Sequence, residues 1–364
     1  MLLKSIQIKN FRNLNLETNF SPSINIIVGA NGSGKSNFLD SIFYLAFAKS
    51  FKKYSERNNI TYNDKVDFAS ITAKSERKKT LLELKVVFSI DSNGFERKRL
   101  EVNKKLKQKA DFIGNIYLSL FAPHNINLLG GTPEMRRDEL DDFISVVDKQ
   151  YLKSISEYKQ VLNNRNHLLP RVRDGLASKK ELDFWTEKLI ELGAYILDCR
   201  RSIIDEFQGF VRNEAEVFEK QLKNLEIHYK SRILSEGKDS LSSFQQIIND
   251  NYDKELIVGK SLYGPHRDDY DFISGGKDLK IYASRGQQRI VTMIFKTAMW
   301  HYFVDVKKVR ALLLLDDIMS ELDNDNRKKV EKMIEMLATQ TFITSTSSKG
   351  FTTKLVESAY KINL

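Results

Sequence analysis

The sequence predicts a mixed α/β fold with a β-rich flank and an inserted α-helical lobe. Three observations carry this prediction. A buried strand, a glycine-rich loop and an amphipathic helix follow one another between residues 24 and 46. Strand patterns return at 311–315 and 342–344, with a helical pattern at 327–337 between them. The residues from 134 to 250 are polar and show helical periodicity, so a helical block divides the βαβ pattern.

The composition limits the size, partners and location of the protein. The 364 residues, 41% of them hydrophobic, allow two domains or one domain with an insertion. The net charge of +10 suits a polyanion such as DNA, RNA or an anionic membrane, although a merely soluble basic protein has the same balance. The single cysteine, Cys199, excludes a disulfide framework. No apolar run approaches membrane-spanning length and the first residues lack a signal-peptide core, so we expect a cytoplasmic protein.

The glycine-rich loop matches the phosphate-binding pattern G-x-x-x-x-G-K-[ST] without a mismatch. Its glycines allow successive backbone N–H groups to point at phosphate oxygens, and the following helix places its N-terminus beside them. Lys35 supplies a cation to the β- and γ-phosphates, and the hydroxyl of Ser36 is a ligand for Mg²⁺. The predicted ATP-contacting residues of the loop are Gly29, Ala30, Asn31, Gly32, Ser33, Gly34, Lys35 and Ser36.

A second acidic motif follows the apolar run Leu312–Leu315, which reads as a buried central strand. Asp316 at the carboxyl end of this strand is predicted to hold Mg²⁺, directly or through water. Asp317 is the candidate general base for the attacking water and, with Lys35, a predicted catalytic residue. A strand that simply ends in solvated acids is the alternative.

The segment Ser284–Gln288, called the signature segment below, precedes an apolar helical pattern. Ser284 and Gln287 have capping-box spacing, and Ser284 beside Gly286 predicts a small anion pocket. The order of phosphate loop, signature segment and Asp-Asp strand is typical of ABC-class ATPases, in which such a segment binds the γ-phosphate of ATP on a second head. We therefore expect Ser284, Gly286 and Gln287 to contact ATP across a homodimer.

Two further positions follow from this class assignment. The segment Ser320–Asp323 falls where ABC ATPases place their D-loop, so Asp323 is also a predicted nucleotide-site residue. Thr344–Thr346 follows the last strand, where many such ATPases place a switch histidine. The absence of a histidine there leaves the γ-phosphate sensor open.

The predicted domains are an N-terminal part of the ATPase head at 1–130, a helical lobe at 131–255 and a C-terminal part of the head at 256–364. Within the lobe we expect a compact bundle or a short arm rather than a long coiled coil, because no heptad persists and several residues interrupt the helical pattern. These residues are Pro170, Gly175, Gly193, Gly209 and Gly237.

The β-rich flank contains a predicted hairpin, with strands at 81–90 and 95–102 and the turn Asp91–Gly94. Its second strand begins a basic segment that bears one acid, Glu101. Such a segment can track DNA phosphates without reading sequence, or it can be a solvated basic edge that prevents strand pairing. The basic residues are Arg97, Lys98, Arg99, Lys104, Lys105, Lys107 and Lys109, and a second cluster consists of Lys49, Lys52, Lys53 and Arg57.

Several motifs together resemble the RecF family of bacterial recombination-repair ATPases, which are related to the SMC heads. These motifs run in the family's order through nearly the whole chain: Ile8–Leu14, Gly29–Ser36, Ser50–Lys52, Pro133–Arg137 with Leu140–Asp141, Gly264–Asp269, Ser284–Arg289 and Leu312–Asp323. One departure is the segment at 121–125, where family members carry an acidic residue after the proline, so the Q-loop residue stays open. Arg267, Asp268 and Asp269 have a catalytic, interfacial or structural role.

The resemblance implies an ABC/SMC-type P-loop ATPase head that works as an ATP-dependent DNA-binding clamp. Such a clamp acts at single-stranded gaps and junctions, helps to load recombinase with mediator proteins of the RecR and RecO type, and supports replication and the SOS response. The implied cofactors are ATP and Mg²⁺, and the implied activity is a weak, DNA-stimulated ATP hydrolysis.

Two other classes of function remain as alternatives. An ABC ATPase that drives a membrane transporter shares the nucleotide motifs, but we find no transporter-coupling segment. A non-catalytic module that uses nucleotide as a switch is favoured by the Asp-Asp pair, because the shorter carboxylate of Asp317 moves the base away from the water. Helicase and nuclease activities are not expected, because neither further helicase motifs nor another acidic metal cluster is present in the sequence.

Overall fold

The structure is a computed structural model of the chain that describes residues 1–52, 54–62, 66–77, 79–222, 224–234, 239–320, 322, 324–345 and 359–364. Two compact units make up the chain. Unit 1 consists of Met1–Ile126 and Met293–Leu364, and unit 2 consists of Asn127–Thr292. The domain boundaries predicted above, at 130/131 and 255/256, stay predictions.

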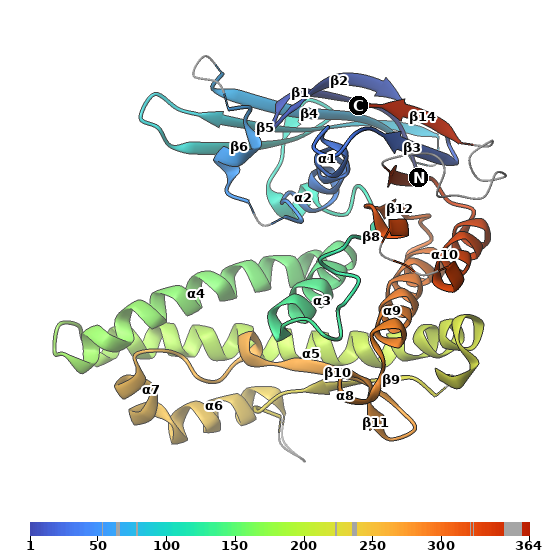
Figure 1. The fold of residues 1–364 in the computed structure, drawn as a ribbon. Helices are drawn as coiled ribbons and strands as arrows, with labels where there is room; N and C mark the ends of the chain where they lie inside the picture. The colour runs from blue at the N-terminus through green and yellow to red at the C-terminus, as the bar shows by residue number, and fades with distance from the viewer. Residues whose placement is uncertain are drawn as a thin grey trace. The chain divides into compact units, whose positions relative to one another are not determined.

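Unit 1 contains a six-stranded antiparallel sheet with the order β2-β1-β4-β5-β6-β7 (Figure 1). The predicted hairpin is confirmed, because β5 and β6 pair in antiparallel register from Ile90 opposite Glu96 onward. At its turn, Asp91 Oδ1 accepts the N–H groups of Asn93 and Phe95, and Gly94 takes a φ of 79°, which favours glycine. The strands are β1 (Leu2–Phe11), β2 (Leu14–Asn19), β4 (Phe68–Arg77), β5 (Thr80–Ile90), β6 (Glu96–Val102) and β7 (Lys105–Leu106).

The second sheet of unit 1 is parallel, with the order β14-β3-β13-β12-β8. All four residues of β12 are buried, as expected for a central strand of a parallel sheet. Because every pair is parallel, the carboxyl ends of β3 and β12 lie at the same edge of the sheet. The strands are β3 (Ile24–Val28), β8 (Leu118–Phe121), β12 (Leu312–Leu315), β13 (Thr341–Ser345) and β14 (Tyr360–Asn363).

Helix α1 (Lys35–Phe47) packs against strands of both sheets, and eleven of its residues are buried. This burial follows from the sequence, since the helix is apolar on nearly every side and has no acidic residue in its first turn. The remaining helices of unit 1 are η1 (Glu56–Asn59), α2 (Lys109–Phe112), η4 (Ile318–Ser320) and α10 (Asn324–Leu337). Helix α9 (Arg285–Asp305) begins in unit 2 and ends in unit 1.

Unit 2 is built on an antiparallel pair of long helices, α4 (Lys149–Arg173) and α5 (Lys179–Phe218), with α6 (Ser240–Asp250) packed against α5 (Figure 1). Side-chain caps begin these helices: Asp148 accepts from Gln150, Ser178 from Glu181 and Asp239 from Ser242. The other helices of unit 2 are α3 (Pro133–Val147), η2 (Lys220–Leu222), α7 (Tyr252–Val258), η3 (Pro265–Arg267) and α8 (Leu279–Tyr282).

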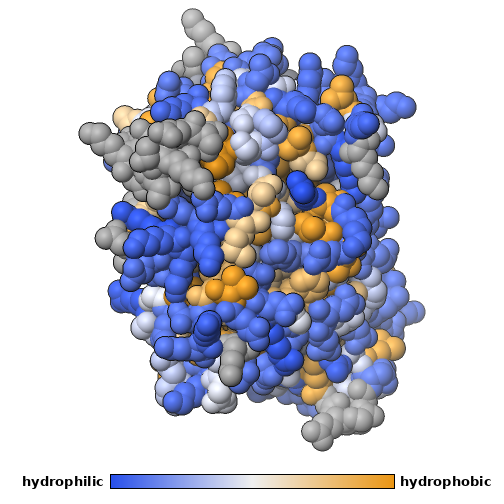
Figure 2. Space-filling model, turned by 90° about the vertical axis from the view of Figure 1, so that its right-hand side faces the viewer, coloured by the Kyte–Doolittle hydropathy of each residue, from blue (hydrophilic) through white to orange (hydrophobic). Residues whose placement is uncertain are grey.

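One face of the molecule, shown in Figure 2, is mainly hydrophilic with small groups of hydrophobic side chains.

The structure differs from the sequence interpretation of residues 134–250 in two ways. First, this stretch contains the strand β9 (Glu226–Lys230), which pairs with β10 (Asp269–Ser274) and, through it, joins β11 (Lys277–Asp278). A five-residue strand that depends on a partner forty residues away has no strong local signal. Second, α5 runs unbroken for 40 residues.

Three of the expected helix interruptions are therefore wrong. Pro170 lies inside the last turn of α4, and Gly193 and Gly209 lie inside α5. Packing explains Gly193, because a Cβ built there would come within 2.4 Å of the Phe244 ring. The interruption at Gly175 is confirmed, since this glycine follows α4 with a φ of +71°. Gly237 lies outside the described residues.

A pair of glycine substitutions within α5 separates packing from helix propensity. We expect Gly193→Ala to lower the free energy of unfolding, because Phe244 is fully buried and cannot withdraw from the new methyl group. Gly209→Ala is the matched control: it meets nothing within 4 Å and should raise stability by about 0.5–1 kcal/mol through better helix propensity. Urea unfolding followed by helical circular dichroism measures both, and equal effects of the two variants would contradict the packing argument.

Candidate functional site

The phosphate loop follows β3 and ends at the first residue of α1, as the sequence predicts. Lys35 lies over the loop, where its Nζ donates to the carbonyl oxygens of Gly29 and Ala30 at 2.8 Å each. Gly34 takes a φ of 109°, and a Cβ there would come within 2.7 Å of Leu14 Cδ2. Only glycine therefore fits at Gly34, and the loop is held in one backbone conformation.

A row of polar side chains supports the loop from one side. Asn13 donates to the carbonyl oxygen of Gly32 at 3.2 Å and accepts from the amide of Asn37 at 2.8 Å. The Oδ1 atom of Asn37 accepts from Arg12 at 3.0 Å and from Lys52 at 2.9 Å. These contacts join the residues that follow β1 to the first turn of α1.

A buried ion pair lies behind this row. Arg12 Nη2 is 2.6 Å from Asp40 Oδ2, and the two side chains are 7% and 0% exposed. Ser50 and the N–H of Phe51 also donate to Asp40, at 2.6 and 2.9 Å. Burial raises the pKa of Asp40, while Arg12 and the hydrogen bond from Ser50 act in the opposite direction. The pair ties β1, α1 and the Ser50–Lys52 segment together.

Asp316 lies at the carboxyl end of β12, and Thr344 on the neighbouring strand β13 holds it. Thr344 Oγ1 donates to Asp316 Oδ1 at 2.9 Å and accepts the N–H of Asp317 at 2.8 Å. Burial raises the pKa of Asp316, against the hydrogen bonds from Thr344 and Ser36 and the charge of Lys52. The two predicted Mg²⁺ ligands, Ser36 and Asp316, are therefore in contact. The hydroxyl group of Thr344 orders both Asp316 and Asp317.

Asp317 has a φ of 47°, in the left-handed region that is rare for residues other than glycine, asparagine and aspartate. The hydrogen bond from its N–H to Thr344 stabilises this conformation. The sequence draws attention to Thr344 only as the place of a missing switch histidine. Its role as a bridge depends on the pairing of β12 with β13, which no local pattern reveals.

Lys52 lies beside the candidate nucleotide site in this structure. It is half-buried, and burial together with the charge of Arg12 lowers its pKa, while Asp316 and Asp40 raise it. The sequence interpretation places Lys52 in a basic cluster with its neighbours along the chain. It cannot place Lys52 beside Asn37 and Asp316, because such proximity depends on the fold. Its partner in the cluster, Lys53, lies outside the described residues.

The signature segment lies in unit 2, and the phosphate loop lies in unit 1. The predicted capping box is present: Ser284 Oγ accepts the N–H of Gln287 at 3.3 Å, and Gln287 Oε1 accepts the N–H of Ser284 at 2.9 Å. Ser284 and Arg285 are exposed. Asp323, together with Glu321 and Thr346, lies outside the described residues.

The Gly264–Asp269 motif takes part in an ion-pair network inside unit 2. Arg136, 1% exposed, binds Asp269 with two bonds of 2.7 Å, and Tyr229 donates to Asp268 at 2.7 Å. Arg200 donates to Asp141 at 2.8 Å and to the carbonyl oxygen of Pro265 at 2.7 Å. These contacts give Asp268 and Asp269 a structural role.

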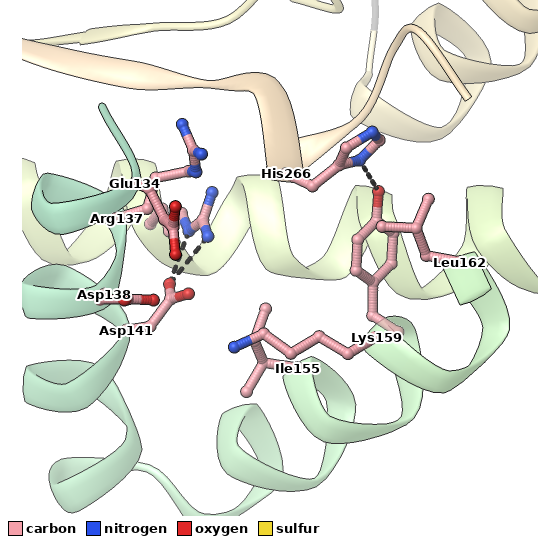
Figure 3. A pocket seen from close by; sticks show the side chains of 10 residues that line it. Glu134, Arg137, Asp138, Asp141, Ile155, Lys159, Leu162 and His266 are labelled. Atoms are coloured by element: carbon pink, nitrogen blue, oxygen red, sulfur yellow. Dashed lines mark hydrogen bonds and ion pairs between the residues drawn. The ribbon is translucent and has the colours of Figure 1, made fainter. Parts of the chain in front are cut away.

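A cavity of about 220 Å³ lies beside this network and is lined from α3, α4, α5 and η3 (Figure 3). His266 points into it and accepts a hydrogen bond on Nδ1 from Tyr158 at 2.7 Å, while Nε2 faces the carbonyl oxygen of Ser261 at 3.2 Å. Since a carbonyl only accepts, the proton sits on Nε2. Burial and the nearby cations Arg267 and Arg137 lower the pKa of His266 to about 4. The imidazole is therefore neutral at pH 7.

The arrangement in unit 1 can bind a nucleoside triphosphate through phosphates and Mg²⁺. The phosphate loop and Asp316 each follow a strand of the same parallel sheet, and the hydroxyl group of Ser36 joins the loop to Asp316. With a capped Ser-x-Gly-Gln at the start of α9, these features define the class of P-loop ATPase heads of the ABC/SMC type.

Comparison with known proteins narrows this class. The model of the family described as RecF/RecN/SMC N terminal domain matches residues 2–363. A protein of Bacillus cereus named DNA replication and repair protein RecF is 33% identical over the whole chain and 97% of its own length, and its Bacillus mycoides counterpart is 32% identical over the same shares. The chain therefore belongs to the RecF proteins within the RecF/RecN/SMC family.

Solved structures agree with this assignment. The structure of the recombination mediator protein RecF-ATPrS in the RecFOR pathway has a TM-score of 0.88 and 27% identity, and covers 99% of this chain and 95% of its own. The structure of RecF-ATP in the same pathway has a TM-score of 0.85, with 95% and 92% coverage. An SmcHead structure at 15% identity and a TM-score of 0.52 shares the fold.

His266 makes the stability of unit 2 depend on pH. In the folded chain the pKa of His266 is about 4, against 6.5 in the unfolded chain. Between these two pH values His266 is therefore protonated in the unfolded chain and neutral in the folded chain. The contribution of neutral His266 to the free energy of unfolding is complete above pH 6.5. It falls by up to about 3 kcal/mol as the pH is lowered to 4. We expect His266→Asn, which keeps an acceptor for Tyr158, to lose less stability than the unmodified chain between pH 7 and 5.

Urea midpoints from helical circular dichroism at the two pH values test this. The control is His228→Asn, since His228 is an exposed histidine of the same unit. A pH dependence of His266→Asn equal to that of the unmodified chain would show that other groups cause the acid sensitivity.

Proposed function

We propose that this chain is an ATP-dependent DNA-binding clamp of recombinational DNA repair, with slow ATP hydrolysis that releases it. The observation that carries the proposal is the contact of Ser36, Asp316 and Thr344 at the end of the phosphate loop. ATP is the proposed nucleotide because two similar structures are described as RecF-ATP and RecF-ATPrS. The relatives named DNA replication and repair proteins support the biological role.

Each residue of the site has a proposed task. The N–H groups of Gly29–Ser36 and the ammonium of Lys35 bind the phosphates, for which Lys35 leaves the carbonyl oxygens that it now contacts. Ser36 and Asp316 hold Mg²⁺, which supplies positive charge to the phosphate oxygens. Lys52 adds a second cation beside Asn37. Asp317 orients and deprotonates the attacking water.

Two copies of the chain are proposed to enclose ATP. Ser284, Gly286 and Gln287 of one copy contact the γ-phosphate held by the loop of the other, and Asp323 contributes from the D-loop. The exposure of Ser284 and its place at the N-terminus of α9 support this role. ATP thus controls dimerisation, and hydrolysis reopens the dimer.

DNA contact is proposed for the basic segment of β6 and β7. Two of its cations already have partners, since Arg97 pairs with Asp91 at 3.1 Å and Lys98 pairs with Glu56. The remaining exposed cations are better suited to phosphates, which give affinity without sequence readout. They are Arg99, Lys104, Lys105 and Lys107.

The repair pathway in which the chain acts is proposed from its family. Gapped or junction DNA is the proposed substrate, and mediator proteins of the RecR and RecO type are the proposed partners in recombinase loading, replication and the SOS response. The reference to a RecFOR pathway in the similar structures supports these partners. DNA stimulates the ATPase in this proposal, without nuclease or helicase action. No described helix is long and apolar enough to cross a membrane, and a cytoplasmic location is proposed.

The dimer model predicts a strong effect of a large cation in the signature segment. We expect the unmodified chain to sediment as a monomer without nucleotide, and as a dimer that retains gapped DNA with ATP. Ser284→Arg should bind ATP but stay monomeric, because the long side chain occupies the space of the γ-phosphate. Ser202→Arg, at an exposed position of α5, is the control and should dimerise normally. Normal dimerisation of Ser284→Arg would refute the ATP-sandwich model.

Thr344 should act as a positioning residue for hydrolysis. Thr344→Val removes the hydrogen bonds to Asp316 and from Asp317, so we expect ATP turnover to fall about tenfold or more. Thr344→Ser keeps the hydroxyl and should restore turnover. Steady-state phosphate release measures both.

Asp317→Asn is the reference for a lost base, since it should abolish turnover while ATP-dependent dimers still form. If Asp317→Asn turns over as fast as the unmodified chain, Asp317 is not the base. If Thr344→Val and Thr344→Ser are equally active, the bridge through Thr344 does not position the acids.

A further inference from the structure

Two large apolar side chains are exposed directly before the signature segment. Ile281 and Tyr282, at the end of α8, are 72% and 68% exposed. Their neighbour Leu279 is buried at 7%, so α8 is anchored on one side and presents apolar surface on the other. Exposed apolar groups are scattered on the mainly hydrophilic face of Figure 2. Ile257 and Val258 at the end of α7 are a second exposed pair, but only Ile281 and Tyr282 adjoin the signature segment.

The position of this pair relative to Ser284 is fixed by hydrogen bonds. Asp278 accepts the N–H of Lys280 at 2.9 Å and starts α8, and the N–H of Ala283 donates to the carbonyl oxygen of Leu279 at 3.2 Å. The amide of Gln288, in the first turn of α9, donates to the carbonyl oxygens of Lys280 and Ala283 at 3.2 and 3.3 Å. Gln288 therefore clamps α8 to the start of α9.

Chain geometry keeps the pair close to Ser284. Consecutive Cα atoms are about 3.8 Å apart, so Tyr282 and Ser284 are separated by at most about 7 Å. Ser284 and Arg285 are exposed as well, and the four residues form one accessible strip. A second copy that brings a phosphate to Ser284 therefore comes within side-chain reach of Tyr282.

We propose that Ile281 and Tyr282 are the apolar anchor of the interface with a second copy of this chain. The proposal rests on the ATP-enclosed dimer proposed above. It adds an apolar and aromatic centre to the interface, beside the polar contacts that the phosphates of ATP make. The pair is continuous with the signature segment, which favours a second copy over any other occupant. In a two-fold symmetric dimer the pair is used twice, so each substitution acts at two places.

The test uses serine substitutions and a matched control in the full chain. Ile281→Ser and Tyr282→Ser remove the apolar anchor, and Tyr282→Phe keeps it. Ile257→Ser is the control, because Ile257 in the same unit is also an isoleucine with 72% exposure. Sedimentation equilibrium with ATP gives the dimer Kd, calorimetric titration of the monomer gives the ATP Kd, and thermal melting verifies folding.

We expect the dimer Kd of Ile281→Ser and Tyr282→Ser to rise about tenfold or more, with an unchanged ATP Kd and melting temperature. Ile257→Ser and Tyr282→Phe should dimerise like the unmodified chain. Equal dimerisation of all variants, while Ser284→Arg stays monomeric, would overturn the inference and leave the proposed function intact. Normal dimers that lose only DNA or a mediator protein would likewise overturn it, because the pair would then serve another partner. An unmodified chain that stays monomeric with ATP would refute the ATP-enclosed dimer itself.

Discussion

The nucleotide site depends on the buried pair of Arg12 and Asp40. Two charges are taken out of water here, and their mutual contact of 2.6 Å and the bonds from Ser50 and Phe51 compensate for the lost hydration. Removal of either partner leaves an unpaired buried charge, which costs about 3–5 kcal/mol. Because Arg12 also contacts Asn37, the pair orders the first turn of α1 and, through it, the phosphate loop.

Parallel strands supply the second constraint. The pairing of β3 with β13 and of β13 with β12 brings three carboxyl ends to one edge, where the loop, Thr344 and Asp316 meet. The raised pKa of Asp316, which burial causes, favours a site in which a divalent cation compensates the carboxylate. The unusual φ of Asp317 adds a local constraint that the Thr344 hydroxyl stabilises. The proposed catalysis thus depends on the fixed positions of these groups at one sheet edge.

Unit 2 uses the same physical device for a different purpose. Three buried arginines each have a carboxylate partner: Arg136 with Asp269, Arg165 with Glu255 and Arg200 with Asp141. These pairs tie α3, α4 and α5 to α7 and the Gly264–Asp269 motif. A charged motif that is specific to a family therefore serves packing here. The signature segment and the exposed pair Ile281 and Tyr282 are presented from this rigid frame.

The sequence alone determined the phosphate loop, the Asp-Asp strand, the capping box and the hairpin, because each is built from a short continuous stretch of the chain. It also pointed to the family through a series of motifs in the family's order. Only the tertiary structure decided the bridge of Thr344, the place of Lys52 beside Asn37, the unbroken course of α5 through Gly193 and the strand β9. Each of these depends on a partner far along the chain, and local pattern carries no information about such a partner.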